Sequence, residues 1–176
     1  NLARTLDSGQ VFHWQKWASG FAGTIGSKGV YVEQQGNLLF FSGATTEKIG
    51  NYFALDHPLA EICRSFPDDP AMRAARDFCP GLRIMRQPRW ECLATFITSS
   101  MKQVAHIRQI SQTLRTRYGG RVRVFDCEVH TFRPASRIGG LRAQELRKCA
   151  LGYRAKNVVG TASVSGRGQG RAGTRA

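Results

Sequence analysis

Apolar and polar residues alternate in short runs over the first 43 residues of the chain. The runs are rich in β-branched and aromatic residues, and turn residues such as Ser19-Gly20 and Gln35-Gly36-Asn37 separate them. This pattern predicts a small antiparallel meander. The four strands expected in it are Val11–Trp17, Phe21–Ile25, Val30–Glu33 and Leu38–Phe41.

Beyond the meander, apolar residues recur at helical spacing, and cap residues mark where helices begin. Thr45 or Thr46 can cap a helix that runs to about Leu55. Asp69 before Pro70 predicts another helix, because an N-cap carboxylate and a proline at the first helical position both favour a helix start. The residues expected on one face of this helix are Met72, Ala75 and Phe78.

Two further helices are predicted after the break at Cys79-Pro80-Gly81. The first starts near Glu91, and Ser100 with Gln103 fits a capping box for the second, which stops at Gly119. The residues expected to point inward from the second helix are Val104, Ile107, Ile110 and Leu114. Those expected on its exposed face are His106, Arg108, Arg115 and Arg117.

The remaining segments are predicted from composition and periodicity. A loop through Gly119–Arg123 leads to an irregular stretch around Thr131–Gly140, and helical patterns resume at Ala143–Cys149 and Tyr153–Ala162. The last twelve residues, Ser165–Ala176, are rich in Gly and Arg and of low complexity, which predicts a disordered tail. A nucleic-acid-binding tail of the RGG type and a translation artefact after a break in the coding sequence are the alternatives.

Charge is divided unevenly along the 176 residues, which carry a formal net charge of +14. Residues 1–80 have a net charge of −1 and residues 81–176 a net charge of +15, most of it from arginine. Such asymmetry indicates a neutral scaffold joined to a surface that binds a polyanion, and nucleic acid is the leading partner. A basic face that merely aids solubility is the alternative.

The composition points to a globular protein that is 41% apolar. No apolar run approaches the roughly 18 residues of a membrane helix, and no secretory leader is visible at Asn1. We therefore predict an intracellular protein with no membrane partner. The five cysteines lack the clustering of a zinc or iron–sulfur site, so no metal and no cofactor are predicted.

Three stretches together resemble the 8-oxoguanine DNA glycosylases of the helix-hairpin-helix superfamily. They are SGQVFHW at residues 8–14, RQPRWECL at 86–93 running on to FITSS at 96–100, and LRKCALGYRAK at 146–156. Their order and spacing make the combination specific. The resemblance covers roughly residues 1–162, with a loose match around Arg121–Arg142.

The resemblance implies an α+β fold. A TBP-like antiparallel β-sheet with helices is expected over residues 1–82, and the truncated start of an all-α helix-hairpin-helix glycosylase domain over residues 83–162. The third predicted segment of the chain is a disordered Gly/Arg tail at residues 163–176.

The activity that the resemblance implies is base-excision repair of oxidised purine in duplex DNA. The family flips 8-oxoguanine out of the duplex and displaces it with a lysine amine, and the resulting Schiff base gives an associated AP-lyase activity. In the family, a hairpin loop, the nucleophilic lysine and a paired aspartate all lie downstream of the helix that matches the one starting at Tyr153 in this chain. We therefore expect no catalytic residue in this chain, and none of its lysines occupies the nucleophile's position: Lys16, Lys28, Lys48, Lys102, Lys148 and Lys156.

Two residues match positions around the family's base pocket. Gly9 matches the glycine whose carbonyl oxygen accepts a hydrogen bond from the N7–H of the oxidised base, where normal guanine has only an acceptor. Phe96 matches an aromatic residue beside the pocket. From the pattern alone, Gly9 reads as a turn glycine and Phe96 as a core residue.

Two basic stretches match positions that contact DNA. Tyr153 matches the wedge that enters the base stack, and Arg154 a residue that contacts the unpaired cytosine, while Lys148 and Lys156 are placed for phosphates. An ordinary tyrosine at a helix start is the alternative for Tyr153.

In the family, a set of residues after Ser99-Ser100 recognises the base opposite the lesion. At these positions the present sequence differs from the best-known eukaryotic members. Met101, Lys102 and Gln103 stand where those members carry asparagines, and His106 stands where they carry an arginine. Met101 could fill space in the unstacked duplex, and His106 reads equally well as a plain surface histidine.

The predicted partner is duplex DNA containing 8-oxoguanine, in a bacterial cytoplasm or nucleoid or in a eukaryotic nucleus. No protein partner is predicted. Two alternatives remain open: a catalytically inactive DNA-binding module, and a basic RNA-binding protein suggested by the charge and the tail.

Overall fold

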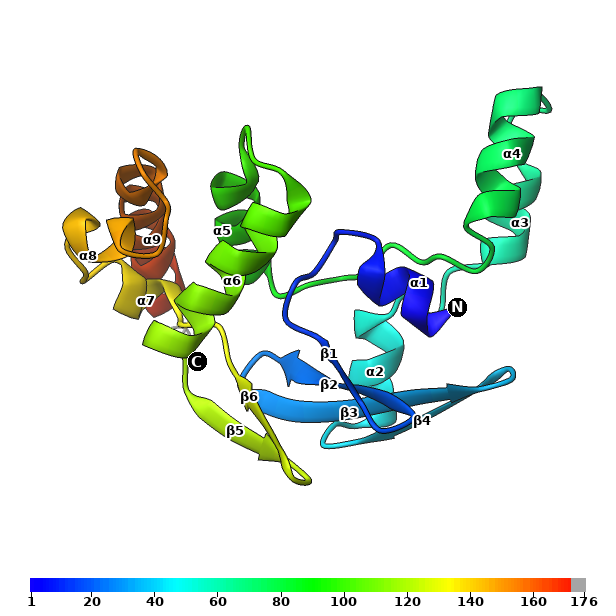
Figure 1. Cartoon of the computed structure of the whole chain (residues 1–176), viewed down its shortest axis with the longest axis horizontal. Helices are drawn as coiled ribbons and strands as arrows, with labels where there is room; N and C mark the ends of the chain where they lie inside the picture. The colour runs from blue at the N-terminus through cyan, green and yellow to red at the C-terminus, as the bar shows by residue number, and fades with distance from the viewer. Residues whose placement is uncertain (172–176) are drawn as a thin grey trace.

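A four-stranded antiparallel sheet occupies the first quarter of the computed structural model, which describes residues 1–171 (Figure 1). Its strands pair in the order β1-β2-β3-β4, as the meander predicted. They are β1 (Gln15–Trp17), β2 (Gly20–Ile25), β3 (Lys28–Gln35) and β4 (Leu38–Ser42). The first strand starts later than expected, since Val11–Trp14 lie outside the ladder.

Both faces of the sheet are covered, which explains why every residue of β2 is buried. Phe21 and Val32 pair across β2 and β3 and face a core closed by α1 (Leu2–Asp7) and α2 (Thr46–Tyr52). Thr45 caps α2 by accepting a hydrogen bond from the backbone of Lys48, as expected from the sequence. Helix α1 was not predicted.

A hairpin made of β5 (Arg121–Val124) and β6 (Cys127–His130) covers the other face of the sheet. Val124, Cys127 and Val129 pack there against Ala22 of β2. The prediction of a loop through Gly119–Arg123 was therefore wrong. Because the hairpin packs on the sheet, the second half of the chain is not purely helical.

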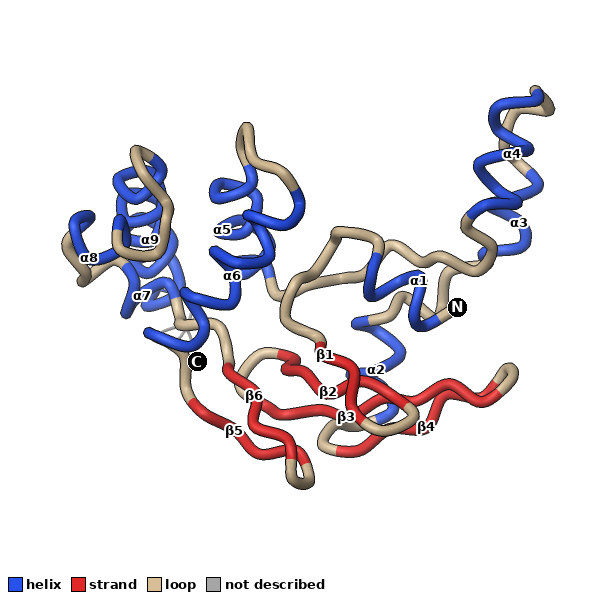
Figure 2. The backbone as a smooth tube through the Cα atoms, in the orientation of Figure 1, coloured by secondary structure: helices blue, strands red, loops and turns tan. Residues whose placement is uncertain are grey.

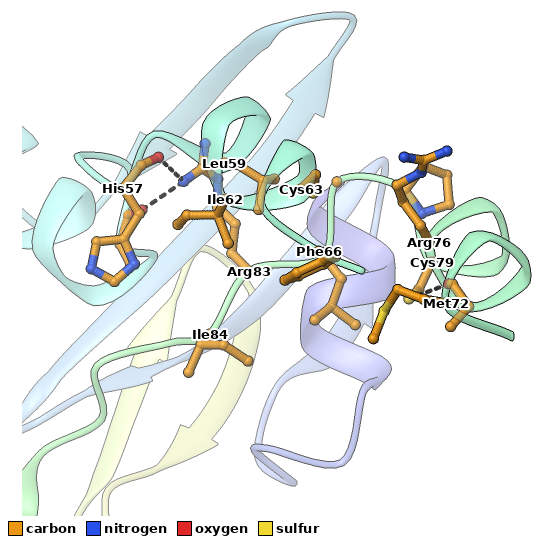
Figure 3. A pocket seen from close by; sticks show the side chains of 15 residues that line it. His57, Leu59, Ile62, Cys63, Phe66, Met72, Arg76, Cys79, Arg83 and Ile84 are labelled. Atoms are coloured by element: carbon orange, nitrogen blue, oxygen red, sulfur yellow. Dashed lines mark hydrogen bonds between the residues drawn. The ribbon is translucent and has the colours of Figure 1, made fainter. Parts of the chain in front are cut away.

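Helices α3 (Leu59–Arg64) and α4 (Pro70–Phe78) form a pair that projects from the sheet, on the side opposite α5 to α9 (Figures 1 and 2). The side chain of Asp69 caps α4, as predicted. Met72 and Ala75 line a largely apolar cavity of about 260 Å³ between the pair and residues 79–84 (Figure 3). Phe78 does not share this face, since 83% of it is exposed.

The remaining helices form a second core. They are α5 (Arg89–Ser99), α6 (Val104–Tyr118), α7 (Ala135–Ile138), α8 (Ala143–Arg147) and α9 (Arg154–Arg171). The core holds Ile110, Leu114, Leu146 and Val158, among others. Two expectations for the start of α6 were wrong: Gln103 is its N-cap without a side-chain bond, so no capping box forms, and Val104 is exposed.

The end of the chain differs from the predicted disordered tail. Helix α9 continues to Arg171, so residues 163–171 are helical, and residues 172–176 lie outside the described residues. Among the described helices, none has the length and apolar character needed to cross a membrane. The α+β fold class is confirmed, while the domain boundaries at residues 82 and 162 remain predictions.

Candidate base pocket and nucleic-acid interface

A pocket of about 290 Å³ lies between the segment after α1, one side of α5 and the start of α6. Both residues predicted for a base pocket, Gly9 and Phe96, line it. The other lining residues are Gln10, Phe12, Gln87, Cys92, Thr95, Ser99, Val104 and Ile107. The structure thus brings together two positions that are far apart in the sequence.

Phe96 lies at the mouth of this pocket and not in the core, since 74% of it is exposed. Its interpretation as a core residue was therefore wrong. Val104, also in the lining, is 56% exposed, and Met101 on the adjacent loop is 92% exposed. Three exposed apolar side chains beside a pocket form a surface suited to stacking or wedging against a flat apolar ligand.

Gly9 adopts a backbone φ of +85°, a conformation that side chains disfavour. A Cβ at this position would meet nothing within 4 Å, so backbone conformation, rather than crowding, is what requires glycine here. The Gly9 carbonyl oxygen accepts no hydrogen bond from the described part of the chain. It remains free to bind an external donor.

The start of α9 is tied to the loop between α5 and α6. The guanidinium of Arg154 donates a hydrogen bond to the carbonyl oxygen of Ser100 and lies 4.5 Å from the centre of the Tyr153 ring. Arg154 is buried, with 5% exposed, whereas Tyr153 is 59% exposed. The predicted wedge residue is therefore presented at the surface, while the residue matched to a cytosine contact faces the protein.

The loop that Arg154 contacts carries three of the predicted DNA-binding residues. Met101 adopts φ +51°, and Lys102 donates its backbone N–H to the carbonyl oxygen of Ser99. Lys102 and Gln103 are exposed, as is His106 in the first turn of α6. The side chains of this loop are thus available to a ligand.

The two remaining predicted residues are also exposed. Lys156 follows Tyr153 by one turn of α9. Lys148 lies at the end of α8, where its carbonyl oxygen accepts a hydrogen bond from Arg117. Lys148 does not line the pocket, and no hydrogen bond or ion pair within the described residues joins it to the α5–α6 loop.

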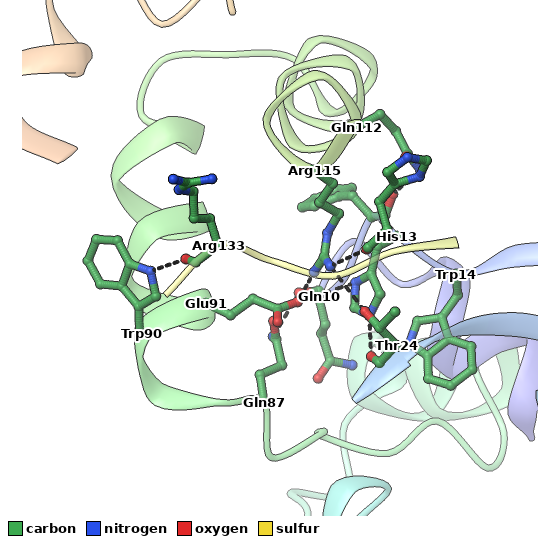
Figure 4. Close-up of polar contacts among 12 residues, drawn as sticks. Gln10, His13, Trp14, Thr24, Gln87, Trp90, Glu91, Gln112, Arg115 and Arg133 are labelled. Atoms are coloured by element: carbon green, nitrogen blue, oxygen red, sulfur yellow. Dashed lines mark hydrogen bonds and ion pairs between the residues drawn. The ribbon is translucent and has the colours of Figure 1, made fainter. Parts of the chain in front are cut away.

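Sequence reasoning missed a buried polar cluster that includes His13 and Glu91 (Figure 4), the sequence neighbours of Phe12 and Cys92 in the pocket lining. Arg115 was expected on the exposed face of α6, but its side chain is 2% exposed and pairs with Glu91 of α5. His13 lies 3.4 Å from the same carboxylate, and its Nε2–H donates to the carbonyl oxygen of Thr24 in β2 at 2.9 Å. Since a carbonyl can only accept, this bond places a proton on Nε2.

Burial controls the ionisation of this cluster. Desolvation, assisted by the charge of Arg115, holds the pKa of His13 well below its ordinary value, so the ring is neutral at pH 7. Desolvation also raises the pKa of Glu91 and lowers that of Arg115, and the attraction between the two opposes both shifts. The cluster joins the sheet to α5 and α6 and so supports two walls of the pocket.

Residues 1–93 match the family model of the 8-oxoguanine DNA glycosylase N-terminal domain. The chain belongs to this family. It is 30% identical over 174 residues to N-glycosylase/DNA lyase OGG1 of Arabidopsis thaliana, and 28% identical over 183 residues to N-glycosylase/DNA lyase of Saccharomyces cerevisiae. These matches cover 93% and 92% of this chain but 48% of each relative, so the chain spans about half the length of these curated relatives.

Solved structures of the family share the fold. MBOgg1, whose structure is in complex with a low-affinity DNA ligand, superposes with a TM-score of 0.88 at 27% identity, over 96% of this chain and 60% of that chain. The Clostridium acetobutylicum 8-oxoguanine glycosylase/lyase superposes with a TM-score of 0.87 at 24% identity, over the same shares of the two chains. The latter structure contains double-stranded DNA with cytosine opposite 8-oxoG.

Within the described residues, no cluster of three or more His, Cys, Asp or Glu side chains could hold a metal ion. The site is built instead from one free backbone carbonyl, exposed apolar side chains and basic residues.

Proposed function

We propose that this chain recognises 8-oxoguanine in duplex DNA and forms the lesion-binding part of a base-excision repair glycosylase with associated AP-lyase activity. The observation that carries the proposal is the pocket shared by Gly9 and Phe96, in which one carbonyl oxygen is free to accept a hydrogen bond. The N7–H of 8-oxoguanine supplies the donor, whereas the N7 of guanine would meet the carbonyl as a second acceptor.

Base flipping suits the surface around this pocket. A flipped base leaves a gap in the stack, and proteins that extrude bases fill such gaps with apolar or aromatic wedges. Tyr153 and Met101 are exposed on two elements that the Arg154–Ser100 hydrogen bond holds together. We propose that these two side chains enter the duplex beside the extruded nucleotide.

The role of this chain in the family reaction is binding and selection, not covalent chemistry. Displacement of the base requires an unprotonated amine held against the sugar in a site that excludes water. All six lysines are exposed, and none lines the pocket. This supports the interpretation that residues 1–171 contain no nucleophile.

The similarity to known proteins supports the same function at the level of the whole enzyme. The curated relatives are named as N-glycosylases and DNA lyases, and one structural relative holds DNA containing 8-oxoG. An RNA-binding function rested partly on a disordered Gly/Arg tail, and much of that segment lies in α9. A location with the genome, in a nucleoid or a nucleus, follows from the proposal.

The proposal is tested by measuring the affinity of the 176-residue chain for two matched duplexes. One has 8-oxoguanine opposite cytosine and the other has guanine at the same position. We expect tighter binding of the lesion duplex, no effect of excess single-stranded RNA, and no covalent adduct on borohydride treatment. Equal affinity for the two duplexes would refute lesion recognition, and a trapped adduct would refute the exclusion of covalent chemistry.

A further inference from the structure

The peptide that presents the Gly9 carbonyl is anchored from its C-terminal side by the amide of Gln10. The Gln10 Oε1 atom accepts a hydrogen bond from the backbone N–H of Met85 at 2.9 Å. Its Nε2 atom donates to the carbonyl oxygen of Arg83 at 2.9 Å and to the hydroxyl of Ser8 at 2.8 Å. One side chain therefore bridges across Gly9 and ties the loop to residues 83–85.

A second amide, that of Gln87, holds the backbone of Gln10. It lies just before α5, and its Nε2 atom donates to the backbone carbonyl oxygen of Gln10 at 2.8 Å. Gln112 of α6 makes a similar bond to the carbonyl oxygen of Phe12 at 2.9 Å. The side chain of Gln10 thus holds residues 83–85. The side chain of Gln87 in turn holds the backbone of Gln10, and both side chains are drawn in Figure 4.

Gly9 itself supplies little to fix its own orientation. It has no side chain, nothing lies within 4 Å of its Cβ position, and its carbonyl accepts no bond from the described residues. Glycine rotates freely about φ and ψ, so its peptide plane takes the direction that the flanking bonds impose. A hydrogen bond to a base edge requires near-linear geometry, so a rotated carbonyl would no longer make it.

We infer that Gln10 and Gln87 form a two-part amide clamp that aims the Gly9 carbonyl at the lesion. They are positioning residues, and their role rests on the proposed function of the pocket. The clamp selects the lesion because the same fixed carbonyl that accepts from N7–H repels the lone pair of unmodified N7. A loose carbonyl could turn away from guanine and tolerate it.

The test uses Gln87→Met, which keeps the length of the side chain and removes its donor. Gln109→Met is the matched control, because Gln109 is exposed on α6 and outside the pocket. The readout is the ratio of affinities of the 176-residue chain for the 8-oxoguanine duplex and the guanine duplex. We expect Gln87→Met to reduce this ratio about tenfold, through weaker binding of the 8-oxoguanine duplex and equal or tighter binding of the guanine duplex. We expect Gln109→Met to leave the ratio unchanged.

Amide hydrogen exchange of the free chain provides a second measurement that does not depend on DNA. The Met85 amide, which donates to the Gln10 side chain, should exchange faster in Gln87→Met, whereas loss of a direct Gln87–base contact would leave its exchange in the free chain unchanged. If the wild-type chain discriminates between the duplexes but Gln87→Met leaves either the exchange or the affinity ratio unchanged, the clamp is refuted. The proposed function is not affected by that result. A wild-type chain that does not discriminate refutes the proposed function, and the role of the clamp in recognition falls with it.

Discussion

Glu91 and Arg115 form a buried ion pair that joins helix α5 to helix α6, with side-chain exposures of 5% and 2%. The same guanidinium donates at 3.1 Å to the hydroxyl of Thr24 in β2 and at 3.1 Å to the carbonyl oxygen of His130 at the end of β6. One side chain therefore connects the sheet, the hairpin and two helices. Its loss should affect the whole junction.

Replacement of Arg115 by methionine should strongly destabilise the chain. The substitution leaves the Glu91 carboxylate buried without its partner, which typically costs about 3–5 kcal/mol of unfolding free energy. Urea denaturation measures the effect. The double variant Glu91→Leu/Arg115→Met should be more stable than Arg115→Met alone, because it removes the orphaned charge. Arg117→Met, exposed on the same helix, is the control, and a loss as large as that of Arg115→Met would contradict this assignment.

His13 should make stability depend on pH in the acid range. Its pKa in the folded chain lies well below the ordinary value of 6.5, so below pH 6.5 the unfolded chain takes up a proton that the folded chain does not. Stability should therefore fall as the pH is lowered from 7 to 5. His13→Gln, which can still donate to Thr24, should lose this component of the decline, as urea midpoints at both pH values would show. The exposed control His106→Gln should behave as wild type, and an unchanged slope in His13→Gln would rule out His13 as the source.

Exposed lysines near the α5–α6 loop should set the salt dependence of DNA binding. If Lys102 and Lys156 bind phosphates, replacing both with glutamine should flatten the plot of log affinity against log salt by about 0.9 for each phosphate that is no longer neutralised. Lys28 and Lys48, exposed in the first half of the chain, provide a control with the same change of charge. Equal flattening by both pairs would show that only net charge matters, and not the location of the lysines.

Gly9→Ala should reduce both the stability of the chain and its preference for 8-oxoguanine, and a matched glycine variant can separate the two effects. Alanine at a positive φ costs about 1–2 kcal/mol of stability. Gly36→Ala is a matched control, because Gly36 also has a positive φ, of +58°, and open space at its Cβ position, but lies in the turn between β3 and β4. Both variants should lose similar stability in denaturation. Only Gly9→Ala should lose preference for 8-oxoguanine, and a parallel loss in Gly36→Ala would assign the effect to stability.

The local elements were predictable because their determinants are local. The four-stranded meander and the Asp69-Pro70 helix start follow from turn residues and caps a few positions apart. The β5–β6 hairpin was missed although Val122, Val124, Cys127 and Val129 alternate with polar residues. Its stability comes from packing on Ala22 of the distant sheet, which no local pattern reveals.

The sequence predicted where the pocket lies, but not the buried ion pair of Glu91 and Arg115 next to it. The resemblance singled out Gly9 and Phe96, and the fold places both in one pocket. Arg115 was assigned to the surface by its charge, although it follows Ile107 by eight residues and so falls on the buried face of α6. Glu91 is one of only four acidic residues in the basic half, and this scarcity was the available sign of an internal partner. A buried charge becomes predictable only when its partner is known.

Tyr153→Ala should weaken binding to the lesion duplex more than binding to undamaged duplex. Only the state with an extruded base has a gap that the ring can fill, and base–aromatic stacking contributes about 1–3 kcal/mol. Tyr153→Phe should retain most of the affinity, because it keeps the ring and its contact with Arg154. Phe78→Ala removes an exposed aromatic ring from α4, outside the pocket lining, and should change neither affinity. Anisotropy titrations with both duplexes measure these differences, and equal losses of Tyr153→Ala on the two duplexes would reduce the tyrosine to an ordinary helix-start residue.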